Sequence, residues 1–281
     1  MSVRITADST CDLSAELLER YSVSVYPLSV SLGDRTGKDG IDMTPEDIYA
    51  YVDKTGDLPK SSAVNVGEYA DFFSAFVQNG DSLVHFSLGS GFSSTHQNAC
   101  LAAEDFENVY VVDSANLSTG QGLVVIKAAE MAAAGKSAKE IYDACCLLTK
   151  NVEASFVLDN LSYLKKGGRC SSLAALGANL LKLKPCIEVK DGGMGVGKKY
   201  RGNIGNVMLD YVKDRLSDRE DLDTSRIFVT HTKCDPADVE AVKNAVKEIR
   251  PDFEEVLETT AGCTITTHCG PGTLGILFIR K

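Results

Sequence analysis

The chain has 281 residues, of which 44% are hydrophobic and 24% are charged. This composition is typical of a soluble globular protein of one or two domains and excludes wholesale disorder and fibrous repeats. The 39 acidic and 29 basic residues give a net charge of −10, which disfavours nucleic acid as a partner. The apolar runs are much shorter than the roughly 20 residues that span a bilayer, and the N-terminus has no apolar signal-peptide core. We therefore expect a cytoplasmic protein without stable membrane insertion.

The nine cysteines are odd in number and irregularly spaced, which favours free buried thiols over disulfides in a reducing compartment. A zinc site would have to combine His231 and Cys234 with Cys263, His268 and Cys269. No Cys-x-x-Cys pair anchors such a site, so we expect no bound metal.

The first 150 residues alternate short β-branched segments with amphipathic ones. Thr44, Asn65 and Ser137 are each followed three residues later by an acidic residue, a pattern typical of a helix N-terminus. Strands are predicted at Val3–Ala7, Ser82–Leu88 and Val109–Asp113. This alternation predicts an N-terminal α/β domain, residues 1–150, with a flavodoxin-like parallel sheet and helices on both faces.

Residues 151–281 have a different spacing. The turn at Asp191–Gly193 separates Ile187–Lys190 from Met194–Tyr200, which predicts an antiparallel hairpin. Asp235 followed by Pro236 predicts a helix start. Further strands are predicted at Ser155–Leu158, Arg226–His231 and Leu274–Arg280. We expect a second domain with a mixed sheet and helices, packed closely on the first because no Pro-, Gly- and Ser-rich linker separates them.

Small hydroxylated residues follow the strands of the predicted parallel sheet. They occur at Asp8–Thr10, at Ser90–Thr95, at Asp113–Ser114 and at Ser118–Gly120. In open α/β sheets, ligands bind beyond the carboxyl ends of the strands, where helix N-termini also present free N–H groups. The converging loops therefore predict an anion site, although each serine taken alone is equally explained as a helix cap.

The segment Gly270–Gly275 has the spacing of a dinucleotide-binding fingerprint but lacks its context. That fingerprint follows a strand and opens a helix, whereas the residues after Gly275 are a predicted strand. We therefore expect no cofactor here, and we interpret the glycines as a tight turn with His268 just ahead of it. His268 could donate to an anion, act as a base or bond to a backbone carbonyl.

The segment Lys165–Arg169 contains three cations and two glycines. The lysines and glycines are explained by the end of a short helix, where cations and glycine are both favoured. Arg169 follows the glycines and is not explained in this way. It is a candidate for forked recognition of a carboxylate or phosphate.

Taken together, these segments resemble the DegV family of bacterial fatty acid-binding proteins. The resemblance runs over nearly the whole chain, and its specificity comes from the shared order of motifs that are individually weak. The motifs are Asp8–Leu13, Leu58–Ser62, Phe92–Thr95, Asp113–Ser114 with Ser118, Gly120 and Gly122, Leu161 with Tyr163 and Leu164, Lys166–Arg169, Lys184–Pro185 and His268–Gly272.

The resemblance implies a long-chain fatty acid in a deep apolar tunnel between or within two packed α/β domains. It places the carboxylate contacts on Ser61, Ser93 and His268. Further ligand-binding residues at the matching positions are Ser62, Ser94, Thr95 and Arg169. Arg201, like Arg169, matches basic positions that in the family lie near the pocket or the surface that docks a kinase.

The sequence departs from the family pattern at two motifs. Ser61–Val64 stands where Thr-Ser-Gln-Pro is common, and Ser93–Thr95 stands where Ser-Gly-Thr is usual. The hydroxyls are kept, so the departures concern the shape of the pocket mouth and the choice of acyl chain.

The implied function is that of a non-catalytic carrier, with no catalytic residue of its own, which presents the fatty acid to a separate ATP-dependent kinase that forms an acyl phosphate. Burying roughly a dozen methylenes gives on the order of 10 kcal/mol of gross driving force, while neutral donors would leave the carboxylate reactive. The chain has no P-loop motif for ATP. One alternative is a binding protein for another lipid or small anion without a kinase. Another is a hydrolase with Ser93 as nucleophile and His268 as base, although no Gly-x-Ser-x-Gly elbow is present.

Overall fold

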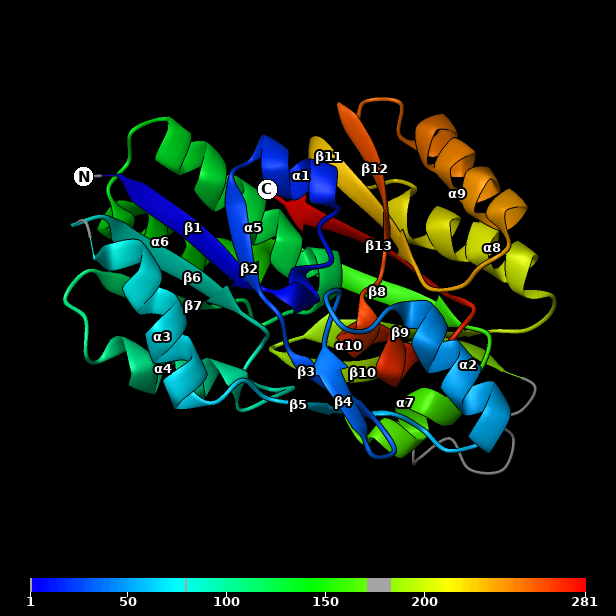
Figure 1. Cartoon of the computed structure of the whole chain (residues 1–281). Coiled ribbons are helices and arrows are strands. Elements are labelled where there is room, and N and C mark those ends of the chain that lie inside the picture. The colour runs from blue at the N-terminus through cyan, green and yellow to red at the C-terminus, as the bar shows by residue number, and fades with distance from the viewer. Residues whose placement is uncertain (1, 79, 171–182) are drawn as a thin grey trace.

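The structure is a computed structural model that describes residues 2–78, 80–170 and 183–281. Two large β-sheets lie next to each other, with helices packed over them (Figure 1). The helices are α1 (Ala15–Arg20), α2 (Pro45–Thr55), α3 (Val66–Val77), α4 (Thr95–Ala103), α5 (Ser118–Ala133), α6 (Ala138–Leu148), α7 (Ser162–Gly167), α8 (Ile204–Leu216), α9 (Pro236–Ile249) and α10 (Cys263–Cys269). Short 3-10 turns occur at η1 (Ser9–Cys11) and η2 (Thr149–Asn151).

The first sheet is entirely parallel. Its strand order is β2 (Val23–Tyr26), β1 (Val3–Asp8), β6 (Ser82–Ser87) and β7 (Val109–Asp113). Helices α3 and α4 pack together against β6 and β7, and α5 and α6 pack together against β1, β6 and β7. The predicted parallel sheet is therefore confirmed.

The second sheet is mixed. Its strand order is β10 (Gly193–Tyr200), β9 (Lys184–Lys190), β8 (Val152–Leu158), β13 (Thr273–Arg280), β11 (Leu222–His231) and β12 (Glu255–Thr260). Strand β12 pairs with β11 in parallel, and the other neighbours are antiparallel. This confirms both the mixed sheet and the predicted β9–β10 hairpin.

Helix α5 joins the two sheets into one core. It contacts β1 and β6 of the parallel sheet as well as β8, β11 and β13 of the mixed sheet. Eleven of its residues are buried, which requires apolar or small side chains around most of the helix. Helices α8 and α9 pack on one face of the mixed sheet, against strand residues such as Val229, Ile276 and Phe278. Phe228 and Leu277 alternate with these residues along the strands and face α5 on the other side of the sheet.

The local caps explain where several helices begin. Thr44, Asn65 and Ser137 each form a complete capping box with the acidic residue three positions later. Asp235 accepts a hydrogen bond from the backbone N–H of Ala237. The predicted starts of α2, α3, α6 and α9 are thus confirmed.

A third, small sheet and α10 were not predicted. The sheet has the order β4 (Arg35–Lys38), β3 (Ser29–Leu32) and β5 (Lys60–Ser62), and all its pairs are antiparallel. Helix α10 contacts β3, β5, α2 and α7, so it lies where the small sheet meets the C-terminal part of the chain. The tight turn predicted from the glycines follows α10 directly, with Gly270 and Gly272 both at positive φ, and His268, expected just ahead of it, lies in the helix itself.

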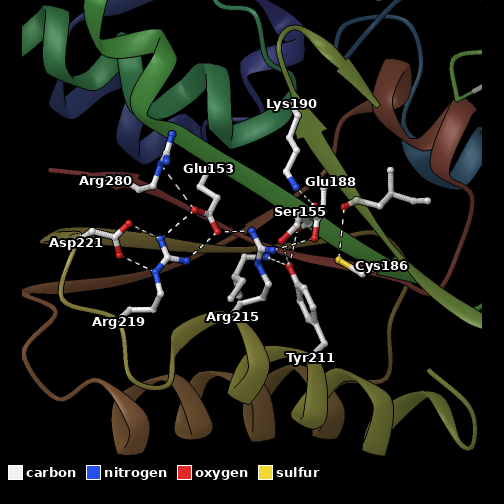
Figure 2. A network of polar contacts seen from close by, with 12 residues as sticks. Glu153, Ser155, Cys186, Glu188, Lys190, Tyr211, Arg215, Arg219, Asp221 and Arg280 are labelled. Atoms are coloured by element: carbon white, nitrogen blue, oxygen red, sulfur yellow. Dashed lines mark hydrogen bonds and ion pairs between the residues drawn. The ribbon is translucent and has the colours of Figure 1, made fainter. Parts of the chain in front are cut away.

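A polar network fastens α8 to the mixed sheet (Figure 2). Arg215 of α8 forms ion pairs with Glu153 of β8 and Glu188 of β9, and Arg219 forms a second ion pair with Glu153. Tyr211 donates to the carbonyl of Ser155 at 2.6 Å. The arginines and glutamates of this network therefore have a structural role, which is to hold α8 and the residues after it on the mixed sheet.

Candidate functional site

Ser61 and His268 come together from segments more than 200 residues apart. Ser61 lies on β5, where it pairs with Val30 of β3, and His268 lies on α10. The Ser61 Oγ and the His268 Nε2 are 2.8 Å apart, which is a hydrogen bond. The contact links the small sheet to α10.

The imidazole of His268 is held in its neutral form. The pKa of His268 is lowered to about 4, mainly by burial and to a smaller extent by the positive charge of Arg169. Its Nδ1 is buried and has no hydrogen-bond partner among the described residues. A neutral imidazole has one N–H, and with that proton on Nε2 it donates to Ser61 and leaves the Ser61 hydroxyl proton free for a ligand.

Ser93 lies on the loop between β6 and α4. Its Oγ is 2.7 Å from the Thr95 Oγ1 and accepts a hydrogen bond from the Thr95 N–H at 3.2 Å. Thr95 is buried, and its two contacts hold the Ser93 hydroxyl in place. Ser94 is exposed and makes no side-chain cap bond to α4.

A cavity opens beside Ser61, Ser93 and His268. The cavity volume is about 60 Å³, and the empty space between its lining atoms, including the part open to solvent, is about 580 Å³. Its other polar lining residues are Ser62, Thr264 and Arg169, whereas Ser94 and Thr95 are outside the lining. The remaining lining residues are Leu28, Ala63, Leu88, Phe92, Leu117, Leu164, Met194, Ile265 and Cys269. The site therefore has a polar end and apolar walls.

A second cavity lies behind the first. The two share Leu117, Ile265 and Cys269 as lining residues, and the second also contacts Phe156 and Leu277 of the mixed sheet. Its hydroxyl groups are engaged elsewhere: the side chains of Thr232 and Thr273 bond to backbone groups, and those of Ser118, Ser155 and Thr230 to other side chains. The second space is therefore apolar in character.

Arg169 is the charged residue among the described residues that line the first cavity. Its side chain is exposed, and one guanidinium N–H donates to the Gly167 carbonyl at 2.6 Å. It adds positive charge at the rim. Arg201 is exposed and is not among the lining residues.

The other strand-end loops do not contribute the anion contacts that were expected of them. Asp8 accepts hydrogen bonds from Tyr69 and from the Leu88 N–H, and Asp113 accepts from Ser90. Ser114 bonds to the Asn116 carbonyl two residues away. These side chains fix the loops, but they do not act as the helix caps that were the alternative explanation, because η1, α4 and α5 each begin without a side-chain cap bond.

Two acidic side chains hold the start of α10. Asp39 accepts hydrogen bonds from the N–H groups of Cys263 and Thr264, at 2.7 and 2.9 Å. Asp12 accepts from the Gly262 N–H at 2.9 Å and from the Ser118 hydroxyl at 2.6 Å. The contacts to Gly262, Cys263 and Thr264 fix the helix that carries His268, and sequence reasoning missed them because these partners are more than 200 residues apart.

The geometry argues against the hydrolase alternative. The hydroxyl of Ser93 bonds to Thr95 rather than to His268, and within the described part of the chain no acid contacts the His268 Nδ1. A Ser93–His268 nucleophile and base pair is therefore not assembled.

The described residues contain no group of three potential metal ligands. Among the helices described here, none has the length and apolar character that a membrane span requires.

The fold is an α/β fold in which helix α5 joins two sheets into one core. The protein has a cavity with apolar walls and a polar end. A family model described as the DegV family matches residues 2–281. A DegV domain-containing protein from Clostridium acetobutylicum is 30% identical over 283 residues, which cover 99% of each chain. The chain therefore belongs to the DegV family, as its motifs suggested.

Solved structures of this family are similar over the whole chain. A DegV family protein from Thermus thermophilus, described for its fatty acid binding, is 27% identical with a TM-score of 0.87 and coverage of 100% of both chains. A stearic acid-binding protein from Eubacterium ventriosum is 29% identical with a TM-score of 0.82, covering 100% of this chain and 99% of that one. Fatty acid binding is thus a property of structurally similar relatives.

Proposed function

We propose that this protein binds a long-chain fatty acid, with the carboxylate at Ser61, Ser93 and His268 and the tail along the apolar walls. The observation that carries the proposal is the apolar cavity whose polar end holds the Ser61–His268 hydrogen bond. A buried carboxylate needs hydrogen-bond donors. The hydroxyl groups supply them, and the neutral imidazole donates to Ser61 and so leaves the Ser61 hydroxyl proton for the carboxylate. The fatty acid-binding relatives support the same ligand class.

The second cavity supports an elongated ligand. Since Leu117, Ile265 and Cys269 border both spaces, movement of these side chains would let a tail continue from one into the other. Each buried methylene contributes about 0.8 kcal/mol of gross affinity. The tail would therefore supply most of the binding free energy, and the polar end would supply orientation.

We further propose that the bound fatty acid is presented to a separate ATP-dependent kinase. Neutral donors leave more electron density on a carboxylate than ammonium or guanidinium groups in direct contact would, so the carboxylate stays a competent nucleophile for the γ-phosphorus. The exposed Arg169 lies at the rim, where it can meet either the carboxylate or a partner.

The ligand is tested by extracting protein expressed in bacteria under denaturing conditions and analysing the extract by mass spectrometry. A stoichiometric long-chain fatty acid supports the proposal, and folded protein that contains none and binds none when fatty acid is added contradicts it. Ser93→Ala should weaken binding, and the exposed neighbour Ser94→Ala is the matched control. The kinase step is tested by mixing loaded protein with a fatty acid kinase catalytic subunit and Mg-ATP and trapping the acyl phosphate with hydroxylamine. No product from a kinase that is active on another DegV protein would favour a carrier that works without a kinase.

A further inference from the structure

Thr264 is a polar residue of the cavity that neither the sequence nor the family resemblance singled out. It lies on α10, one helical turn before His268, and its side chain lines the same cavity as Ser61. Residues four apart on a helix lie on the same face, so Thr264 and His268 are neighbours along the cavity wall.

The hydroxyl of Thr264 has no partner within the described part of the chain. The residue is 3% exposed, and its Oγ1 is buried without a hydrogen bond. A threonine inside a helix commonly bonds to the carbonyl four residues earlier, but here that residue is Thr260, the last of β12. The backbone N–H of Thr264 is already fixed by Asp39, so the side chain is held in place with a free donor.

We propose that Thr264 is a further carboxylate-binding residue, whose hydroxyl donates to the fatty acid head group beside Ser61. This rests on the proposed function and adds a specific contact to it. A buried hydroxyl without a partner destabilises the empty protein, and a carboxylate oxygen in the cavity would satisfy it. Ligand binding would then supply the missing hydrogen bond.

Thr267 provides a matched control on the same helix. Its Oγ1 is likewise buried without a partner among the described residues, but Thr267 does not line the cavity. Thr264→Val and Thr267→Val should both raise the melting temperature of the ligand-free protein, because each removes an unsatisfied polar group. Only Thr264→Val should weaken binding of stearic acid, by about 10- to 100-fold for a hydrogen bond to a charged group.

The experiment measures displacement of a fluorescent fatty acid by stearic acid and by methyl stearate. Thr264→Ser should restore the affinity for stearic acid, and methyl stearate should bind wild type and Thr264→Val with similar affinity. The assignment is overturned if Thr264→Val binds stearic acid like wild type while Ser61→Ala does not, if Thr267→Val loses as much affinity, or if the ester and the acid lose equally. A wild-type protein that binds no fatty acid would overturn the proposed function itself, and Thr264 with it.

Discussion

Gly167 offers a way to disturb His268 without removing any polar group. A Cβ atom built on Gly167 lies 2.7 Å from the His268 Nδ1, closer than a carbon and a nitrogen can approach. Gly167 is the last residue of α7 and has no positive φ, so its backbone accepts alanine. The Gly167→Ala substitution should therefore be absorbed by displacement of the imidazole.

The displacement acts on the hydrogen bond between His268 and Ser61, which is 2.8 Å long. Loss of this bond in a buried site that holds a carboxylate costs about 1–3 kcal/mol, which is roughly 5- to 150-fold in Kd. Alanine favours the helix over glycine by up to about 1 kcal/mol, which offsets part of the cost of moving the ring. We expect weaker fatty acid binding with a free energy of unfolding close to that of the wild type.

Gly168→Ala is the matched control at the next residue. Gly168 has a φ of +70°, and nothing lies within 4 Å of its added Cβ. Alanine in this left-handed conformation should cost about 1–2 kcal/mol of stability but leave the cavity unchanged. Urea unfolding and fatty acid displacement on the two variants measure both effects. Wild-type affinity in Gly167→Ala, or equal losses of affinity in both variants, would refute the reasoning.

Three further predictions concern the cavity, its support and pH. Ile265→Phe enlarges a side chain shared by both cavities, so it should shift preference toward shorter acyl chains in a binding series of chain lengths, and an unchanged preference would contradict a tail that passes this wall. Asp39→Ala removes the acceptor at the start of α10 and should cost about 1–2 kcal/mol of stability in urea unfolding as well as affinity, whereas Arg215→Ala, away from the cavity, should lower stability alone. Since the pKa of His268 is about 4 when folded and about 6.5 when unfolded, the unfolded chain binds a proton first as pH falls, and about 3 kcal/mol of stability present above pH 6.5 should be lost by pH 4. His268→Gln should lose correspondingly less over this range, and identical pH profiles would contradict a buried neutral imidazole.

Local signals in the sequence predicted the elements that are determined locally. The helix starts at Thr44, Asn65 and Ser137 were found because the cap and its acidic partner lie within four residues of each other. The β9–β10 hairpin was predicted from its glycine-rich turn, and in the structure Asp191 and Gly192 adopt the positive φ that such a turn requires. In each case the physical cause and the sequence signal coincide.

Elements stabilised by distant partners could not be predicted in this way. Strand β5 is three residues long and has no apolar alternation, so only its pairing with β3 defines it. Helix α10 contains three threonines and an isoleucine, which favour strands, and its N-terminus is held by Asp12 and Asp39 from the other end of the chain. The residue pattern alone singled out Ser93 and His268, whereas Ser61 entered through the family resemblance and Thr264 only through the structure.

The placement of acidic side chains explains how a chain with a net charge of −10 can offer a site to an anion. Asp39 is turned toward the backbone N–H groups of α10, and the pKa of Asp12 is raised to about 8, mainly by burial and also by the nearby charge of Asp39. Asp12 is therefore mostly protonated at neutral pH and adds little repulsion. A ligand carboxylate would meet Arg169 at the rim and neutral donors inside. A lysine among those donors would bind the carboxylate more tightly but make it a weaker nucleophile, so the hydroxyl and imidazole groups of this cavity are compatible with the proposal that the carboxylate is later phosphorylated.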